Sequence, residues 1–276
     1  MIDLHMHTTA SDGRCTPEDL VQRCWDKGIR TMAVTDHDTM AGVEPTQRAA
    51  TARGMTCLPG IEITSVHGGK DVHMLAYFLP PETPGLQPLL AAQRQQRVNR
   101  ALEIASRLEK LSAPVDADAM VEAAAGSGKS LARPQIAQAL IAAGHVATVA
   151  EAFDRYLGED SPAFVPHTGV APADVVALVV AGGGIPSLAH PGYRPKDDII
   201  PGLVDAGLVA IEVYHSSHDE AATAHYLAIA RRHGLLVTGG SDFHGPGTRR
   251  EEFFGVVHLP QDDLDALMER APHRAL

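Results

Sequence analysis

The chain has 276 residues, a formal net charge of −11 and an apolar content of 45%, as expected for one large globular domain or a domain with an insertion. The negative charge disfavours binding to duplex DNA or to an anionic membrane. No apolar run approaches the roughly 18 residues of a membrane-spanning helix, and no signal-like segment opens the chain, so we expect a cytoplasmic location. The three cysteines form no CxxC pair, which argues against a disulfide framework or a thiolate zinc site.

Seven short β-branched or apolar runs alternate with helix-like segments along the chain. They lie at residues 2–4, 31–35, 56–64, 72–78, 185–189, 208–214 and 235–238. Such alternation predicts a parallel α/β sheet or barrel. The first helix is marked by Thr16 as N-cap, Pro17 at its first position and Gly28 after its end, so we expect it from about Pro17 to Lys27.

A long helical segment interrupts this alternation. Between residues 81 and 165 the strand signal is replaced by sequence rich in Ala, Gln, Arg and Leu, and strands and helices alternate again after Pro166. We therefore predict a barrel domain formed by residues 1–80 and 166–276, with a helical insertion domain formed by residues 81–165.

Side chains of the metal-ligand type gather at the predicted strand ends. His5 and His7 are two residues apart, so both imidazoles point to one face of an extended strand, and Asp242 and His244 repeat this spacing. Active sites of parallel barrels form at the carboxyl ends of the strands. The full set of candidate ligands is His5, His7, Asp12, His37, Glu62, His73, His190, Asp242 and His244.

These nine residues predict a metal centre with more than one ion. Any one of them alone is more often a turn or helix-cap residue, but nine at strand exits would require nine coincidences. A mixed set of imidazoles and carboxylates favours Mn, Zn or Fe in an open catalytic site, and one ion needs fewer ligands. We therefore expect two or three divalent transition-metal ions.

The motifs that contain all of these residues except His73 resemble, in family order, those of the polymerase and histidinol phosphatase (PHP) phosphoesterases. The resemblance implies a distorted (β/α)₇ barrel, here with a helical insertion domain, that holds three metal ions. The matching motifs are Asp3-Leu4-His5-Met6-His7-Thr8 with Ser11-Asp12-Gly13, Thr35-Asp36-His37-Asp38, Gly60-Ile61-Glu62, Ala189-His190-Pro191-Gly192 and Gly240-Ser241-Asp242-Phe243-His244.

The same resemblance distributes the ligands among the ions. Asp12 stands where several relatives have His, and its oxygen favours manganese over zinc or iron. Glu62 would bridge the first ion and the second. The implied sets are His5, His7, Glu62 and Asp242 for the first ion, Glu62, His73 and His190 for the second, and Asp12, His37 and His244 for the third.

Within the family, the insertion, the segment Ala132-Arg133-Pro134 and residues 214–218 are similar to the 3′,5′-nucleoside bisphosphate phosphatases, some of which also trim short RNA from the 5′ end. The resemblance implies a phosphomonoesterase that removes the 3′-phosphate and leaves the 5′-monophosphate. Asp36, His190 and Asp242 are the expected catalytic residues. Asp36, His190 or a water molecule of the metal centre would protonate the leaving group. A nucleotide or short RNA is the expected partner, and the sequence indicates no protein partner.

Cationic or imidazole side chains near the site are candidates to bind the substrate's second phosphate. The segment Gly126-Ser127-Gly128-Lys129-Ser130 lacks the first glycine and the preceding strand of a P-loop, so we do not expect an ATPase. The candidate substrate-binding residues are Lys129, Arg133, Arg194, His215 and His218.

Three other functions stay open at this point. One is a PHP-type phosphatase of histidinol phosphate or a sugar phosphate. Another is an amidohydrolase-type C–N hydrolase, which also opens with an HxH strand but often bridges its metals with a carbamylated lysine. The third is a metal-stabilised nucleotide-binding module without turnover. An assay with a generic phosphomonoester would separate phosphatases from the other two.

Overall fold

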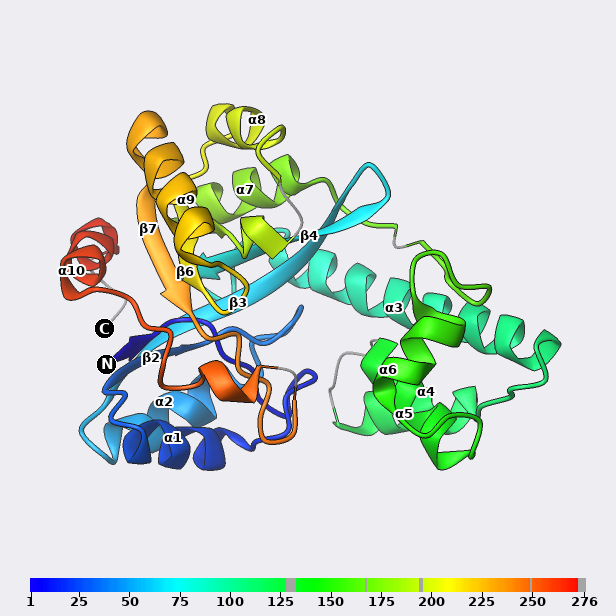
Figure 1. Ribbon diagram of the computed structural model, residues 1–276. Coiled ribbons are helices and arrows are strands. Elements are labelled where there is room, and N and C mark those ends of the chain that lie inside the picture. The colour runs from blue at the N-terminus through cyan, green and yellow to red at the C-terminus, as the bar shows by residue number, and fades with distance from the viewer. Residues whose placement is uncertain (128–132, 167, 194–195, 249, 273–276) are drawn as a thin grey trace.

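Seven strands form one sheet whose spatial order follows the sequence, β1 to β7 (Figure 1). The computed structural model describes residues 1–127, 133–166, 168–193, 196–248 and 250–272. All seven predicted strands are present, with ends that differ by a few residues. The strands are β1 Ile2–Asp3, β2 Thr31–Val34, β3 Thr56–His67, β4 Lys70–Tyr77, β5 Ile185–Leu188, β6 Ala210–His215 and β7 Leu236–Gly240.

Main-chain hydrogen bonds between the two ends of the sheet close it into a barrel. Residues that follow β1 run beside the end of β7: Leu4 N donates to Gly239 O at 3.1 Å, and Asp242 N donates to His5 O at 2.8 Å. Met6 and Phe243 form a parallel bridge one step further on. The segment with His5 and His7 and the segment with Asp242 and His244 are therefore hydrogen-bonded neighbours, although they lie near opposite ends of the chain.

The expectation of a parallel sheet is wrong for β4, which runs antiparallel to both β3 and β5. The reason is the tight turn at Gly68 and Gly69, whose φ angles of 57° and 76° are ones that favour glycine. This turn joins β3 and β4 into a hairpin instead of a crossover. Because β4 is reversed, its beginning lies at the carboxyl end of the other strands, and His73 reaches the site from there.

Helices cover the outside of the barrel, with α1 and α2 on one side and α7, α8 and α9 on the other (Figure 1). The first helix begins as predicted, with Thr16 Oγ1 accepting from Asp19 N at 3.2 Å, and ends one residue early. The α-helices are α1 Pro17–Asp26, α2 Val43–Thr51, α3 Leu86–Lys110, α4 Ala117–Ser127, α5 Arg133–Ala142, α6 Val149–Ala152, α7 Pro172–Ala181, α8 Ile200–Asp205, α9 Glu220–His233 and α10 Gln261–Arg270. A π-helix, η1 Phe153–Leu157, and two 3-10 helices, η2 Pro191–Tyr193 and η3 Glu251–Phe253, complete them.

The segment between β4 and α7 is helical, as predicted, and has an apolar core of its own. Ala101, Ile104 and Leu108 of α3 pack there with residues of α5 and η1. Leu86 and Leu90, at the beginning of the same helix, pack instead into the barrel core. One continuous helix therefore belongs to both cores, and the division at residues 80 and 166 stays a prediction. None of the helices in the described ranges is long and apolar enough to cross a membrane.

Candidate metal centre

Imidazoles and carboxylates from six strand ends converge at one end of the barrel. His5 and His7 lie on the extended segment after β1, and their ring centroids are 5.3 Å apart. Glu62 and His73 lie in β3 and β4, and other candidates follow β2, β5 and β7. Most of these side chains are buried, including Glu62 at 1% exposure. The two-residue spacing of His5 and His7, and of Asp242 and His244, therefore predicted that both side chains of each pair point to one face. The barrel brings the two pairs together.

Glu62 lies at the middle of the cluster. Its Oε1 faces His73 Nδ1 at 2.7 Å and His190 Nε2 at 3.1 Å. Its Oε2 faces three other imidazoles: His5 Nε2 at 3.1 Å, His7 Nε2 at 3.2 Å and His37 Nδ1 at 3.3 Å. The two oxygens of one carboxylate thus face two different sets of nitrogens, which is the arrangement a bridging ligand needs.

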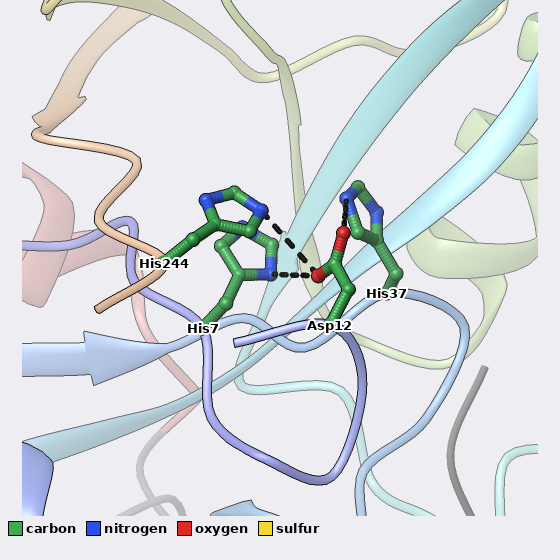
Figure 2. A group of neighbouring side chains, drawn as sticks. All are labelled: His7, Asp12, His37 and His244. Carbon is green, nitrogen blue, oxygen red and sulfur yellow. Dashed lines mark ion pairs between the residues drawn. The ribbon is translucent and has the colours of Figure 1, made fainter. Parts of the chain in front are cut away.

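Among the residues that the structure describes, ligand atoms gather in four groups, within each of which they lie no more than 4.8 Å apart. The group His5, His7, Glu62 and Asp242 is the one expected for the first ion. The group expected for the third ion, drawn in Figure 2, contains His7 in addition to Asp12, His37 and His244. The remaining groups are His37, Glu62 and His73, and His5, Glu212 and His215. His7 and His37 each belong to two groups. The groups in the structure therefore share ligands that the expected sets assign to single ions.

Within the described residues, several buried polar atoms of the cluster have no hydrogen-bond partner. They are both ring nitrogens of His7, Nδ1 of His37, Nδ1 of His190 and Oδ1 of Asp242. Leaving a buried polar atom without a partner costs about 1–3 kcal/mol, and natural proteins seldom leave several of them in one place. Bound cations would satisfy lone pairs of this kind, so the residues fit a metal centre.

The protonation states also suit metal binding. Burial lowers the pKa of His7 and His190 below the usual range and that of His37 to about 3, which favours neutral rings with free lone pairs. Burial alone raises the pKa of Glu62, but the imidazoles of His37 and His5 outweigh it and hold that pKa well below its usual range. Metals bind neutral imidazole and ionised carboxylate, the forms favoured for His7, His37, His190 and Glu62. His5 differs, because the carboxylates of Glu212 and Glu62 outweigh its burial and raise its pKa to about 10.

Two candidate ligands have left-handed backbone conformations. His190 has φ 30° and Asp242 has φ 54°, values that are uncommon for residues other than glycine. Such strain costs of order 1–3 kcal/mol and persists where the surroundings hold it. In Asp242 it is held by the bond from its N–H to His5 O. The strained positions coincide with the cluster, as is common at functional sites.

Asp36, one of the expected catalytic residues, accepts hydrogen bonds on both of its carboxylate oxygens. Its Oδ1 accepts from Thr8 N at 2.8 Å and from Ser11 Oγ at 2.6 Å, and its Oδ2 accepts from Thr8 Oγ1 at 2.6 Å. Both oxygens are therefore engaged by the loop that carries Asp12. The geometry makes Asp36 a positioning residue for that loop and disfavours it as a proton donor.

The expected phosphate-binding residues lie in different surroundings. His218 donates from Nδ1 to Val213 O at 2.7 Å and accepts at Nε2 from Gly192 N at 3.0 Å, so both nitrogens are occupied within the barrel. His215 is buried, with Nε2 3.4 Å from Asp242 Oδ2, and belongs to the metal cluster instead of its rim. Arg133 lies in the insertion, where it donates to Leu157 O at 3.2 Å. Lys129 and Arg194 lie outside the described residues.

Sequence reasoning missed two charged residues at the site. Glu212 in β6 is buried between His5 and His190. Arg250 follows β7, contacts Asp242 Oδ2, and has its guanidinium carbon 5.6 Å from the centre of the Tyr193 ring. A glutamate inside the apolar run at 208–214 was a usable signal for Glu212. Arg250 lies in the loop between β7 and η3. No sequence pattern indicated that this arginine reaches the site.

A seven-stranded α/β barrel with clustered imidazoles and carboxylates at the carboxyl ends of its strands defines a metal-dependent hydrolase. Comparison with known proteins gives the family: the PHP domain matches residues 3–158. The chain belongs to the PHP domain family, which confirms the resemblance expected from the motifs, and with it the barrel fold.

Among curated relatives, a 3′,5′-nucleoside bisphosphate phosphatase of Chromobacterium violaceum is 32% identical over 94% of this chain and 92% of its own. A 5′-3′ exoribonuclease of Escherichia coli, Rnm, is 33% identical over 88% of this chain and 85% of its own. A phosphoribosyl 1,2-cyclic phosphate 1,2-diphosphodiesterase of Eggerthella lenta is 31% identical over 88% and 94%. All three names describe hydrolysis of phosphate esters, and this chain is a hydrolase of that kind.

Solved structures agree over nearly the whole chain. A Bifidobacterium adolescentis protein assigned to the metal-dependent phosphoesterases superposes with a TM-score of 0.89 at 32% identity, covering 98% of this chain and 96% of its own. An amidohydrolase from Chromobacterium violaceum, with bound sulfate and no metal, gives a TM-score of 0.85 at 30% identity, covering 98% and 96%. Both superpositions therefore include most of the helical segment at residues 81–165.

Proposed function

We propose that this chain is a metal-dependent phosphatase that removes the 3′-phosphate of 3′,5′-nucleoside bisphosphates and leaves the 5′-monophosphate. The bridging geometry of Glu62 carries the proposal, because its two oxygens face separate sets of imidazoles. Cations held by these two sets of side chains would suit a phosphate group, which offers several oxygens. The name of the Chromobacterium violaceum relative supports the substrate class.

The candidate ligands would hold two or three divalent ions, and manganese is favoured because Asp12 adds an oxygen to the third set. When bound, such ions polarise phosphate oxygens and lower the pKa of the attacking water. The chain's own part is to keep the ligands fixed: neutral imidazoles present lone pairs, and buried backbone bonds hold Asp242 in its strained conformation.

Arg250 is the group of this chain that we propose to contact the reacting phosphate. Its guanidinium stands beside Asp242 and is mostly buried against the Tyr193 ring. A guanidinium offers five donors in a planar fork, so one can bond to Asp242 while others bind phosphate oxygens. Since Asp36 is engaged elsewhere and burial keeps His190 neutral, we propose that solvent protonates the leaving oxygen.

Arg100 and Arg133 supply the proposed site for the second phosphate. They flank the Phe164 ring, with guanidinium carbons 5.9 and 5.5 Å from its centre. Arg100 Nε donates to Val165 O at 2.8 Å. Burial and the neighbouring Arg133 lower the pKa of Arg100 to about 10, so it is still charged at neutral pH. Two cations crowded together in this way favour an anion between them. Lys129 and Arg194 stay candidates for the same role.

Trimming of short RNA from the 5′ end is a second proposed activity. It is supported by the relatives named 5′-3′ exoribonuclease, among them the Escherichia coli protein. Duplex DNA, membranes and protein partners are not part of the proposal, and the cytoplasmic location stays a prediction. The amidohydrolase alternative expects a lysine between the metal ligands, a position that Glu62 occupies here.

The proposal is tested by comparing substrates on the metal-loaded chain. A 3′,5′-bisphosphate should be hydrolysed with a higher kcat/KM than the matching 3′-monophosphate, and the product should be the 5′-monophosphate. Histidinol phosphate, a sugar phosphate, a 5′-phosphorylated oligoribonucleotide and a cyclic amide complete the panel. A preference for histidinol phosphate or the sugar phosphate, or turnover of the cyclic amide alone, would reject the bisphosphate assignment.

A further inference from the structure

Glu212 of β6 is fully buried, and both of its oxygens are used by other parts of the site. Oε1 lies 2.9 Å from His5 Nδ1, and Oε2 accepts a hydrogen bond from His190 N at 2.7 Å. His5 and His190 are candidate ligands from distant parts of the chain. One carboxylate therefore contacts the ring of one ligand and the backbone of another.

The contact with His5 fixes which ring nitrogen is free. An ionised carboxylate only accepts hydrogen bonds, so Nδ1 of His5 carries the hydrogen that it donates to Glu212. Nε2 then faces the other carboxylates, at 3.1 Å from Glu62 Oε2 and 3.5 Å from Asp242 Oδ1. The bond also sets the orientation of the ring, which has no exposed surface of its own.

The contact with His190 stabilises an unusual backbone conformation. His190 has φ 30° in the turn after β5, and its N–H donates to the carboxylate of Glu212. The charge-assisted bond to Glu212 satisfies this donor and holds the turn. The ring is thereby directed to Glu62, with Nε2 at 3.1 Å from Oε1.

A β-bulge in β6 brings Glu212 to the cluster together with His215. Glu212 pairs with Thr238 and Tyr214 pairs with Gly239, so Val213 is an extra residue on its strand. Residues three apart on a regular strand point to opposite faces, and one extra residue restores them to the same face. Gly239 permits this, because a Cβ there would lie 2.7 Å from Tyr214 Cβ.

We infer that Glu212 is a positioning residue that fixes two metal ligands at once, His5 through its ring and His190 through its backbone. Partners of metal ligands of this kind change metal affinity about 10- to 100-fold when they are lost. Glutamine cannot replace Glu212, because one of its two terminal groups donates and would face a donor. The inference rests on the proposed metal centre and concerns how that centre is held.

The test is cobalt binding to the metal-stripped full-length chain, measured by calorimetry and by visible absorption of the bound Co²⁺. We expect Glu212→Gln to bind the same number of ions as the wild type, about 10- to 100-fold more weakly, with an altered absorption spectrum. Thr238→Val is the matched control: Thr238 is buried opposite Glu212 and bonds Ser187 Oγ at 2.8 Å. Loss of this hydrogen bond in Thr238→Val should lower thermal stability and leave the cobalt affinity and spectrum unchanged.

The outcomes separate this inference from the metal centre itself. If the wild type binds cobalt and the Glu212→Gln variant has the same cobalt affinity and spectrum, the inference alone is overturned. Loss of one whole ion with normal affinity for the rest makes Glu212 a ligand, which also overturns it. A wild type that binds no cobalt overturns the metal centre and the inference together. Circular dichroism checks folding, and Glu212→Asp, which keeps the charge on a shorter side chain, should lie between wild type and Glu212→Gln.

Discussion

Arg97 of α3 and Asp38 of the loop after β2 form a buried ion pair between the helical insertion and the barrel. Arg97 Nε donates to Asp38 Oδ2 at 2.9 Å, and Asp38 Oδ1 accepts from Thr64 N at 2.8 Å. Asp38 directly follows the candidate ligand His37 and has φ 53°. The pair therefore joins the long helix of the insertion to the loop that presents one of the metal ligands.

Loss of one partner of this pair should destabilise the protein strongly. We expect Arg97→Met to lower the free energy of unfolding by about 3–5 kcal/mol, because Asp38 is left buried without its cation. Urea denaturation followed by circular dichroism measures the change. The double variant Arg97→Met/Asp38→Leu should recover part of the loss, since it removes the unpaired charge. A single variant as stable as wild type would contradict the role of the pair.

Much of the barrel and its metal cluster could be predicted because the signals are local. Each strand is a short apolar run, and most of the ligands come within a few residues of a strand end, where barrel geometry fixes their direction. The position of His73 was harder to predict, because it lies near the beginning of its strand. That end reaches the site only because β4 runs antiparallel to its neighbours. The turn Gly68-Gly69 was the available signal for that reversal.

Other features depend on contacts between distant segments. Regular alternation puts Glu212 and His215 on opposite faces, and the bulge at Val213 that unites them is visible only in the pairing with β7. Asp36 has the same local context as its neighbour His37, yet its oxygens are taken by the Thr8–Ser11 loop. Residue type at a strand end therefore identifies candidates, and the tertiary contacts decide their roles.

Metal analysis should find between two and three divalent transition-metal ions per chain. In the part of the chain that the structure describes, the ligand atoms form separate groups, one with His5, Glu62 and Asp242 and another with Asp12, His37 and His244, and one ion cannot use both. Stripping the ions should abolish phosphate release and lower Tm by several degrees, because a metal at 100 times its Kd contributes about 2.7 kcal/mol per site. Elemental analysis and calorimetry provide the measurements. A fully active stripped enzyme, or less than one ion per chain, would contradict the metal assignment.

Glu62→Gln should lower turnover by about 100-fold or more while the barrel stays folded. The amide keeps the shape of the side chain but loses its charge and one of the two acceptor oxygens that face the imidazoles. Activity is measured with a generic phosphomonoester, and folding by circular dichroism. Glu44→Gln is the control, since Glu44 is an exposed carboxylate paired with Arg48. A folded Glu62→Gln variant with near wild-type turnover would rule out the bridging role.

The last prediction distinguishes the roles of two arginines by the substrate whose kcat/KM falls when each is replaced. Arg250 contacts Asp242 within the metal cluster, whereas Arg133 lies in the insertion beside Phe164. A charge-assisted contact to phosphate contributes about 1.5–3 kcal/mol, or roughly tenfold to a hundredfold in kcat/KM. Arg250→Ala should cause this loss on a 3′,5′-bisphosphate and equally on the 3′-monophosphate, because both present the same reacting phosphate.

Arg133→Ala should cause its loss on the bisphosphate alone, since only that substrate has a second phosphate to bind. Arg133→Lys keeps the charge but not the planar fork, so we expect it to recover part of the affinity. Steady-state kinetics of all three variants on both substrates give the comparison. Equal losses from Arg133→Ala on the two substrates would show that Arg133 supports the fold of the insertion instead, and would leave the second phosphate without its proposed site.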